Sequence, residues 1–256
     1  MSRLDKVDNE QERTGKRKAF IAFVIDESGS MDLGKDATLR GINEQIQMIK
    51  NTFKDSKDVE PIVSLVKFNE KVNSVFVNKG LDELKELTND DYRPNGATAM
   101  YDGVGYMLNI LGQTDGIDEE DNSVLVVVVS DGEENSSKEH NSESIAKRVG
   151  EYNQTKRWTF TYLGANQDLS VVSQKTNMYA GNTRTFNSSS SQGYDTAFHS
   201  HNLSFGSYIN NVSRGGVQSV SDFYSSLELR QGGTLNTNNT GVESEPEPDA
   251  TPNPAV

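Results

Sequence analysis

The sequence predicts an α/β fold, with a doubly wound, mostly parallel sheet, helices on both faces and one antiparallel edge strand. Residues 19–25 (AFIAFVI) and 123–130 (SVLVVVVS) are apolar without alternation, as is typical of strands covered on both faces. Strand-like and helix-like segments alternate along the chain, which favours a parallel sheet with crossover helices. The short link NEK joins strand-like residues 61–68 to strand-like residues 72–77, and so tight a link makes that pair antiparallel.

Between the two apolar strands, the pattern predicts three helices. The first follows residues 19–25 and has apolar residues at steps of three and four, namely Leu39, Ile42, Ile46, Ile49 and Phe53. A short polar helix is expected over residues 81–87. The third helix is expected to begin near Thr98 or Ala99, with three apolar residues on one face, namely Val104, Leu108 and Leu111.

After residue 130 the alternation continues. The pattern predicts a helix with Ile145, Val149 and Tyr152, a strand over residues 157–164, a helix from about Leu169, a strand over residues 183–186 and a last helix with Phe198, Phe205, Ile209 and Val212. Trp158, Phe160 and Tyr162 alternate along their strand, and we interpret them as core residues.

These elements divide the chain into three expected parts. Residues 1–17 form a mobile N-terminal arm, residues 18–214 form one folded domain, and residues 215–256 form a largely disordered acidic tail. The tail ends in VESEPEPDATPNPAV, which has too few apolar groups to offset the entropy of ordering.

Composition excludes several classes of function. The chain has 256 residues, no cysteine and a formal net charge of −13, which excludes thiolate chemistry and argues against a nucleic-acid-binding surface. The polar N-terminal residues lack the apolar core of a signal peptide, and no apolar run is long enough to span a membrane. We therefore expect a cytoplasmic protein that binds neither nucleic acid nor membrane. Its oligomeric state stays open.

Oxygen-bearing side chains follow both apolar strands. Asp26, Ser28 and Ser30 follow the first strand as D-x-S-x-S, and Asp131 follows the second. Thr98 lies in PNGATAMYDG, where a loop enters a helix. Because ligands bind beyond the carboxyl ends of parallel strands, we expect these side chains to meet at one edge of the sheet.

Such a set suits a hard cation. It offers two carboxylates and three neutral hydroxyls with no histidine or cysteine, which is the chemistry preferred by Mg²⁺, with Mn²⁺ or Ca²⁺ as alternatives. The neutral hydroxyls would leave the cation electrophilic toward an outside anion.

These motifs resemble those of the von Willebrand factor type A (vWA) domain and its metal-ion-dependent adhesion site (MIDAS). The matching text is DESGSM after an apolar strand, NGATAMYDGV and VVVVSDGEEN, and the resemblance extends over residues 18–212. It implies the Rossmann-like vWA fold, and by motif position it implies that Asp26, Ser28, Ser30, Thr98 and Asp131 are the five metal-site residues. The sequence departs from the family's pattern at Ser130 and Asn95, neither of which is a ligand position.

The resemblance implies binding rather than catalysis. A vWA metal completes its coordination shell with a Glu or Asp of a partner protein. SGSM is more similar to intracellular microbial or phage members than to animal adhesion receptors, and many intracellular members work beside AAA+ ATPases.

Three other interpretations stay open. A metal-dependent phosphohydrolase of the haloacid dehalogenase type also has an Asp after its first strand, but it needs a second carboxylate at the position of Ser28. Any metal could also serve only to stiffen the loops. In the third interpretation, the same residues serve only as turn and capping residues.

The neighbouring acids are not expected to be ligands. We expect four of them to be solvated loop charges, namely Glu27, Asp32, Glu133 and Glu134. Asp102 is expected to face polar groups of a helix or loop.

Overall fold

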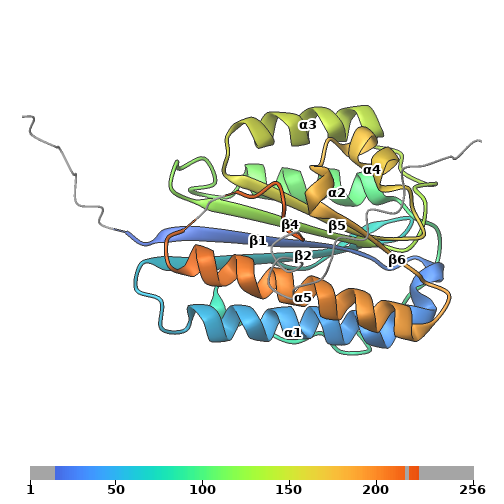
Figure 1. Ribbon diagram of the computed structural model, residues 1–256, viewed down its shortest axis with the longest axis horizontal. Coiled ribbons are helices and arrows are strands. Elements are labelled where there is room, and N and C mark those ends of the chain that lie inside the picture. The colour runs from blue at the N-terminus through green and yellow to red at the C-terminus, as the bar shows by residue number, and fades with distance from the viewer. Residues whose placement is uncertain (1–14, 217–218, 225–256) are drawn as a thin grey trace, which may run out of the picture.

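A computed structural model describes residues 15–216 and 219–224, and these residues form one six-stranded sheet between two layers of helices (Figure 1). The strands are β1 (Arg17–Asp26), β2 (Val59–Phe68), β3 (Val72–Lys79), β4 (Ser123–Ser130), β5 (Trp158–Ala165) and β6 (Thr183–Phe186). The α-helices are α1 (Lys35–Phe53), α2 (Met100–Gly112), α3 (Ser142–Gln154), α4 (Leu169–Thr176) and α5 (Ser191–Ser213). Short 3₁₀ turns are η1 (Gly29–Gly34), η2 (Leu81–Glu83) and η3 (Ala180–Asn182).

The strand order is β3-β2-β1-β4-β5-β6, in which only the edge strand β3 runs antiparallel to its neighbour. The predicted fold class is therefore confirmed. The chain builds outward from β1 to β3 and then returns to place β4 on the other side of β1. The order thus reverses between β1 and β4, which is where ligands bind in open sheets of this kind.

Both faces of the sheet are buried, which explains the unbroken apolar runs. In β1, Phe23 and Ile25 belong to the core beneath α1 and α5, whereas Phe20 and Val24 belong to the core beneath α2 and α3. Figure 1 shows α1 and α5 on one face and α2, α3 and α4 on the other. Trp158 and its neighbours on β5 are buried in the core, as predicted.

The predicted helix over residues 81–87 is wrong in its extent. Only η2 is helical, and the chain then continues in an extended form, with Leu84 and Leu87 buried against the core. The side chain of Asn43 donates to the carbonyl of Leu87 at 2.9 Å and accepts from its N–H at 2.8 Å. These bonds satisfy the backbone N–H and carbonyl of Leu87 in place of helical hydrogen bonds. The segment can therefore remain non-helical beside α1.

A segment beyond the predicted domain boundary at residue 214 also packs on the core. Phe223 and Tyr224, which lie within the predicted tail, are buried. The remainder of that tail, from residue 225, and the arm before residue 15 lie outside the described residues. In the described ranges, 15–216 and 219–224, no helix is both long and apolar enough to cross a membrane.

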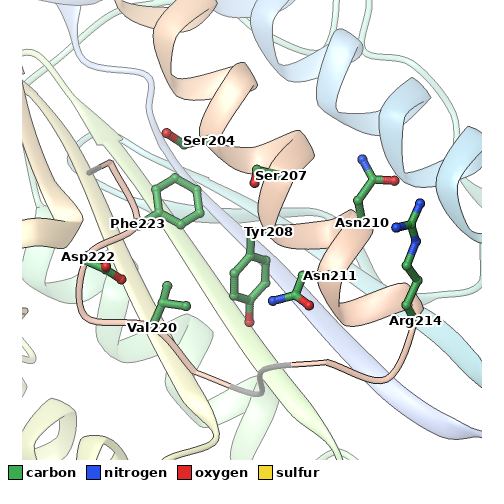
Figure 2. A pocket seen from close by; sticks show the side chains of 9 residues that line it. All are labelled: Ser204, Ser207, Tyr208, Asn210, Asn211, Arg214, Val220, Asp222 and Phe223. Atoms are coloured by element: carbon green, nitrogen blue, oxygen red, sulfur yellow. The ribbon is translucent and has the colours of Figure 1, made fainter. Parts of the chain in front are cut away.

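Residues 219–224 border a cavity of about 590 Å³ beside α5 (Figure 2). Tyr208 and Phe223 both line it. Ser219 Oγ, in the same segment as Phe223, donates to the carbonyl of Lys156 at 2.8 Å, just before β5 begins. The cavity therefore lies at the amino end of the parallel strands, opposite the edge where Asp26 and Asp131 lie.

Candidate metal centre

Asp26 and Asp131 lie at the carboxyl ends of the two central strands. Asp26 is the last residue of β1, and Asp131 directly follows β4. The strands are parallel neighbours with Ile25 paired to Val129, so their ends meet at the switch point of the sheet. The predicted convergence of the two carboxylates is thus found in the structure.

Hydrogen bonds join four of the five predicted residues. Asp26 Oδ1 accepts from the backbone N–H of Ser28 at 2.7 Å. The hydroxyls of Ser28 and Ser30 lie 3.0 Å apart, and Ser30 Oγ donates to Asp131 Oδ1 at 2.6 Å. The D-x-S-x-S segment therefore bends back over the end of β1 and bridges the two aspartates.

Thr98 lies beside this chain of hydrogen bonds. A Cβ built on Gly132 would lie 2.9 Å from Thr98 Oγ1 and 3.5 Å from Ser30 Oγ, so Gly132 leaves room between the two hydroxyls. The N–H of Thr98 donates to Asn135 Oδ1 at 3.0 Å, and its carbonyl accepts from the N–H of Asn135 at 3.0 Å. The loop after β4 thus fixes the backbone of Thr98.

The loop that delivers Thr98 is also tied to the end of β1. Gly29 N–H donates to the carbonyl of Gly96 at 3.0 Å, and Asn95 N–H donates to the carbonyl of Glu27 at 2.8 Å. Three segments distant in sequence therefore form one rim: the residues after β1, the loop before α2 and the residues after β4.

Asp26 is fully buried, and burial is the main reason that its pKa rises to about 6. Hydrogen bonds from Ser130 and Ser28 oppose that rise, and the charge of Asp131 adds to it. Ser130 Oγ donates to Asp26 Oδ2 at 2.6 Å, so this departure from the family's pattern still supplies a hydroxyl. A buried carboxylate is costly unless hydrogen bonds or a cation compensate its charge.

Two of the neighbouring acids are less exposed than predicted. Glu27 is buried because it forms an ion pair with Lys67 at 2.7 Å and accepts from Arg93 N–H at 2.6 Å. Glu134 is half-buried and accepts from Tyr101 N–H at 3.0 Å and Ser137 N–H at 2.8 Å. Each carboxylate fastens one of the loops that form the rim.

The predicted surroundings of the other three acids are confirmed. Asp32 and Glu133 are exposed. Asp102 accepts backbone hydrogen bonds from three consecutive loop residues at 2.7–3.0 Å, namely Lys138, Glu139 and His140.

Tyr194 also contacts the candidate site, although it is not among the residues predicted from the sequence. Its hydroxyl donates to Asp131 Oδ2 from the first turn of α5, and burial followed by this hydrogen bond raises the pKa of Tyr194 above its ordinary value. Tyr194 is 63 residues from Asp131 in sequence. No local motif identifies it, because in the sequence a tyrosine on the apolar face of a helix cannot be distinguished from a core residue.

The donor set fits a hard cation. In the parts of the chain that the structure describes, no three His, Cys, Asp or Glu side chains are grouped to hold a metal, so a site here needs hydroxyl ligands. The hydroxyl of Ser30 donates its hydrogen to Asp131, so it accepts from Ser28 Oγ, 3.0 Å away, and keeps one lone pair for a cation. Two carboxylates with neutral hydroxyls match the oxygen ligands that Mg²⁺ and Ca²⁺ prefer.

Solved structures with the same fold include two adhesion or matrix proteins. The pilus adhesin SpaC from Lactobacillus rhamnosus GG matches with a TM-score of 0.56 and 13% identity, over 77% of this chain and 31% of that one. Proximal thread matrix protein 1 from the mussel byssus, solved with a zinc-occupied MIDAS motif, matches with a TM-score of 0.51 and 15% identity, over 77% of this chain and 48% of that one. The chain thus spans less than half of either protein, and at these identities the likeness concerns the fold.

No curated protein sequence matches the chain. The family model of the von Willebrand factor type A domain matches residues 21–199, which run from within β1 to within α5. The chain therefore belongs to the von Willebrand factor type A domain family.

Proposed function

We propose that Asp26, Ser28, Ser30, Thr98 and Asp131 form a MIDAS that holds one divalent cation of the Mg²⁺ type. The observation that carries this proposal is the bridge from Asp26 through Ser28 and Ser30 to Asp131 at the switch point of the sheet. The zinc-occupied MIDAS of the byssus matrix protein, which has the same fold, supports it. The all-oxygen donor set favours Mg²⁺ here, with Mn²⁺ and Ca²⁺ as weaker alternatives.

The two carboxylates and the three hydroxyls would have different roles in binding the cation. The aspartates supply two negative charges that match a divalent ion, and the hydroxyls add ligands without further charge. When bound, the cation would supply an electrophilic position for a carboxylate from outside. Asp26 lies beneath the rim, whereas Gly29 and Ser30 are exposed, so the open side of the site faces solvent.

The outside ligand that fits this site is a Glu or Asp of a partner protein. The exposed carboxylates of Asp32 and Glu133 lie in the loops that carry the metal-site residues, and they would repel a strongly acidic surface. We therefore propose a partner that presents one acidic residue among neutral or basic neighbours.

We propose that this module binds without catalysis. A phosphohydrolase of the haloacid dehalogenase type would need a carboxylate where Ser28 stands, and a serine cannot act there as the general acid and base. The resemblance to intracellular microbial or phage members further suggests a cytoplasmic setting and an AAA+ ATPase as companion.

Titration calorimetry of the full chain with MgCl₂ and MnCl₂ tests the metal site. We expect one binding site in the wild type, no measurable binding in Asp26→Ala, and unchanged binding in the matched control Glu133→Ala, which removes an exposed carboxylate. Circular dichroism establishes that each variant is folded. Equal affinity of wild type and Asp26→Ala would overturn the assignment.

Acetate tests the capture of a carboxylate. In amide NMR spectra of the Mg²⁺-loaded protein, acetate should shift the resonances of Gly29 and Ser30, and the shifts should vanish with EDTA. Equal shifts in the presence and absence of Mg²⁺ would contradict carboxylate capture by the metal.

A further inference from the structure

Tyr194 and Ser30 bond different oxygens of Asp131. Its ring is buried and packs edge-on against Phe186, with ring centroids 5.0 Å apart. The ring also lies directly on Gly34, because a Cβ at that position would overlap it. Held between these two residues, the phenol has a fixed direction, and its hydroxyl donates to Asp131 Oδ2.

The two carboxylate oxygens of Asp131 therefore accept hydrogen bonds from different neighbours. Oδ1 accepts from Ser30 Oγ at 2.6 Å, on the side of the proposed metal site, whereas Oδ2 accepts from Tyr194. Because the Tyr194 ring is fixed between Gly34 and Phe186, its hydrogen bond sets the orientation of the Asp131 carboxylate. Turning the carboxylate so that both oxygens face one cation would break that bond.

The orientation of the Asp131 carboxylate affects Ca²⁺ and Mg²⁺ differently. Ca²⁺ takes six to eight oxygens at about 2.3–2.6 Å and often binds a carboxylate through both oxygens, whereas Mg²⁺ requires six ligands at about 2.0–2.1 Å in near-octahedral geometry. A carboxylate restricted to one oxygen suits the smaller ion and denies the larger ion a bidentate ligand.

We propose that Tyr194 is a positioning residue that sets the selectivity of the metal site for Mg²⁺ over Ca²⁺ by holding Asp131 Oδ2 away from the cation. This inference rests on the proposed MIDAS. It assigns to α5, which contributes none of the five predicted ligands, a part in choosing the ion.

Tyr194→Phe tests this role because it keeps the ring on Gly34 and Phe186 and removes only the hydroxyl. The matched control is Tyr224→Phe, which removes a buried hydroxyl that lies 2.8 Å from His201 Nδ1. For each protein, titration calorimetry with MgCl₂ and with CaCl₂ gives the ratio of the Ca²⁺ Kd to the Mg²⁺ Kd. Urea unfolding establishes that both variants are folded.

We expect the ratio to fall about tenfold in Tyr194→Phe, by analogy with the roughly 10–100-fold loss of metal affinity that follows removal of a residue that orients a metal ligand. The ratio should stay within about twofold of wild type in Tyr224→Phe. The infrared carboxylate stretch should also show a bidentate band in Ca²⁺-loaded Tyr194→Phe that disappears in Tyr194→Phe/Asp131→Asn.

An unchanged ratio in Tyr194→Phe would overturn the inference, whether both affinities stay the same or both fall together as a purely structural role predicts. That failure differs from a failure of the proposed function. Wild-type metal binding that Asp26→Ala abolishes, combined with an unchanged ratio, removes the role of Tyr194 alone. Absence of any such binding in the wild type removes both.

Discussion

At the scale of single residues, His201 is a buried ionisable group far from the proposed metal site. Its side chain is fully buried in α5, with Nδ1 2.8 Å from the hydroxyl of Tyr224 and the Phe223 ring 5.4 Å away between centroids. Burial, and secondarily the positive charge of Arg184, lowers the pKa of His201 to about 3. The histidine is therefore neutral in the folded protein near neutral pH.

His201 makes the free energy of unfolding depend on pH. Between pH 6.5 and pH 3 the unfolded chain binds a proton at this residue and the folded chain does not, so stability is present above pH 6.5 and falls as the pH drops through that window. From pH 8 to pH 5, wild type should lose about 2 kcal/mol more than His201→Phe in urea unfolding.

The exposed histidine two positions earlier provides the control for this experiment. His199→Gln should lose stability on acidification as wild type does, because His199 is exposed on the same helix. Parallel pH profiles for wild type and His201→Phe would contradict the buried, neutral state of His201.

At the scale of elements, α1 and α5 pack closely through glycines. A Cβ on Gly34, which precedes α1, would overlap the Tyr194 ring, and a Cβ on Gly41 would overlap the Phe198 ring. Tyr194 and Phe198 are one turn apart on α5 and therefore face α1 together. This packing also fixes the position of Tyr194 relative to Asp131.

Gly41→Ala should destabilise the protein although alanine is the better helix former. Overpacking against Phe198 costs about 1–3 kcal/mol, and the gain in helix propensity offsets only part of that cost. Gly206→Ala is the matched control on α5, because its Cβ would meet only Met48 Sδ at 3.6 Å, an ordinary contact. Gly206→Ala should gain about 0.5–1 kcal/mol. Urea midpoints that fall equally in both variants would contradict this account of the helix contact.

At the scale of the whole molecule, the sequence predicts the fold well because both central strands are covered on both faces. The apolar runs that became β1 and β4 show no alternation, and the stripes at steps of three and four became helices. The antiparallel edge strand follows from the three-residue link between β2 and β3. These signals are local, so a single sequence contains them.

What the sequence does not predict depends on contacts between distant segments. Leu84 and Leu87 lie extended because Asn43, on α1, satisfies the backbone of Leu87. Glu27 is buried rather than solvated because Lys67, on the neighbouring strand, pairs with it. Tyr194 joins the candidate site only once α5 has packed beside α1. In each case the partner lies 40 or more residues away.

The five proposed ligands depend both on local motifs and on contacts between distant segments. Each motif is local, but their convergence requires that β1 and β4 be neighbours and that the loop before α2 be tied to the loop after β4. The structure has both features, through the pairing of Ile25 with Val129 and the bonds between Thr98 and Asn135. The binding of a cation by these residues is the step that a measurement must test.

Anomalous scattering from crystals soaked in MnCl₂ tests that step most directly. The account predicts one strong anomalous peak at the carboxyl edge of β1 and β4, within bonding distance of oxygens from the segments that carry Ser30, Thr98 and Asp131, and no peak in crystals of Asp26→Ala. A Mn²⁺ peak held only by exposed carboxylates such as Glu133, or no peak at that edge of the sheet, would contradict it.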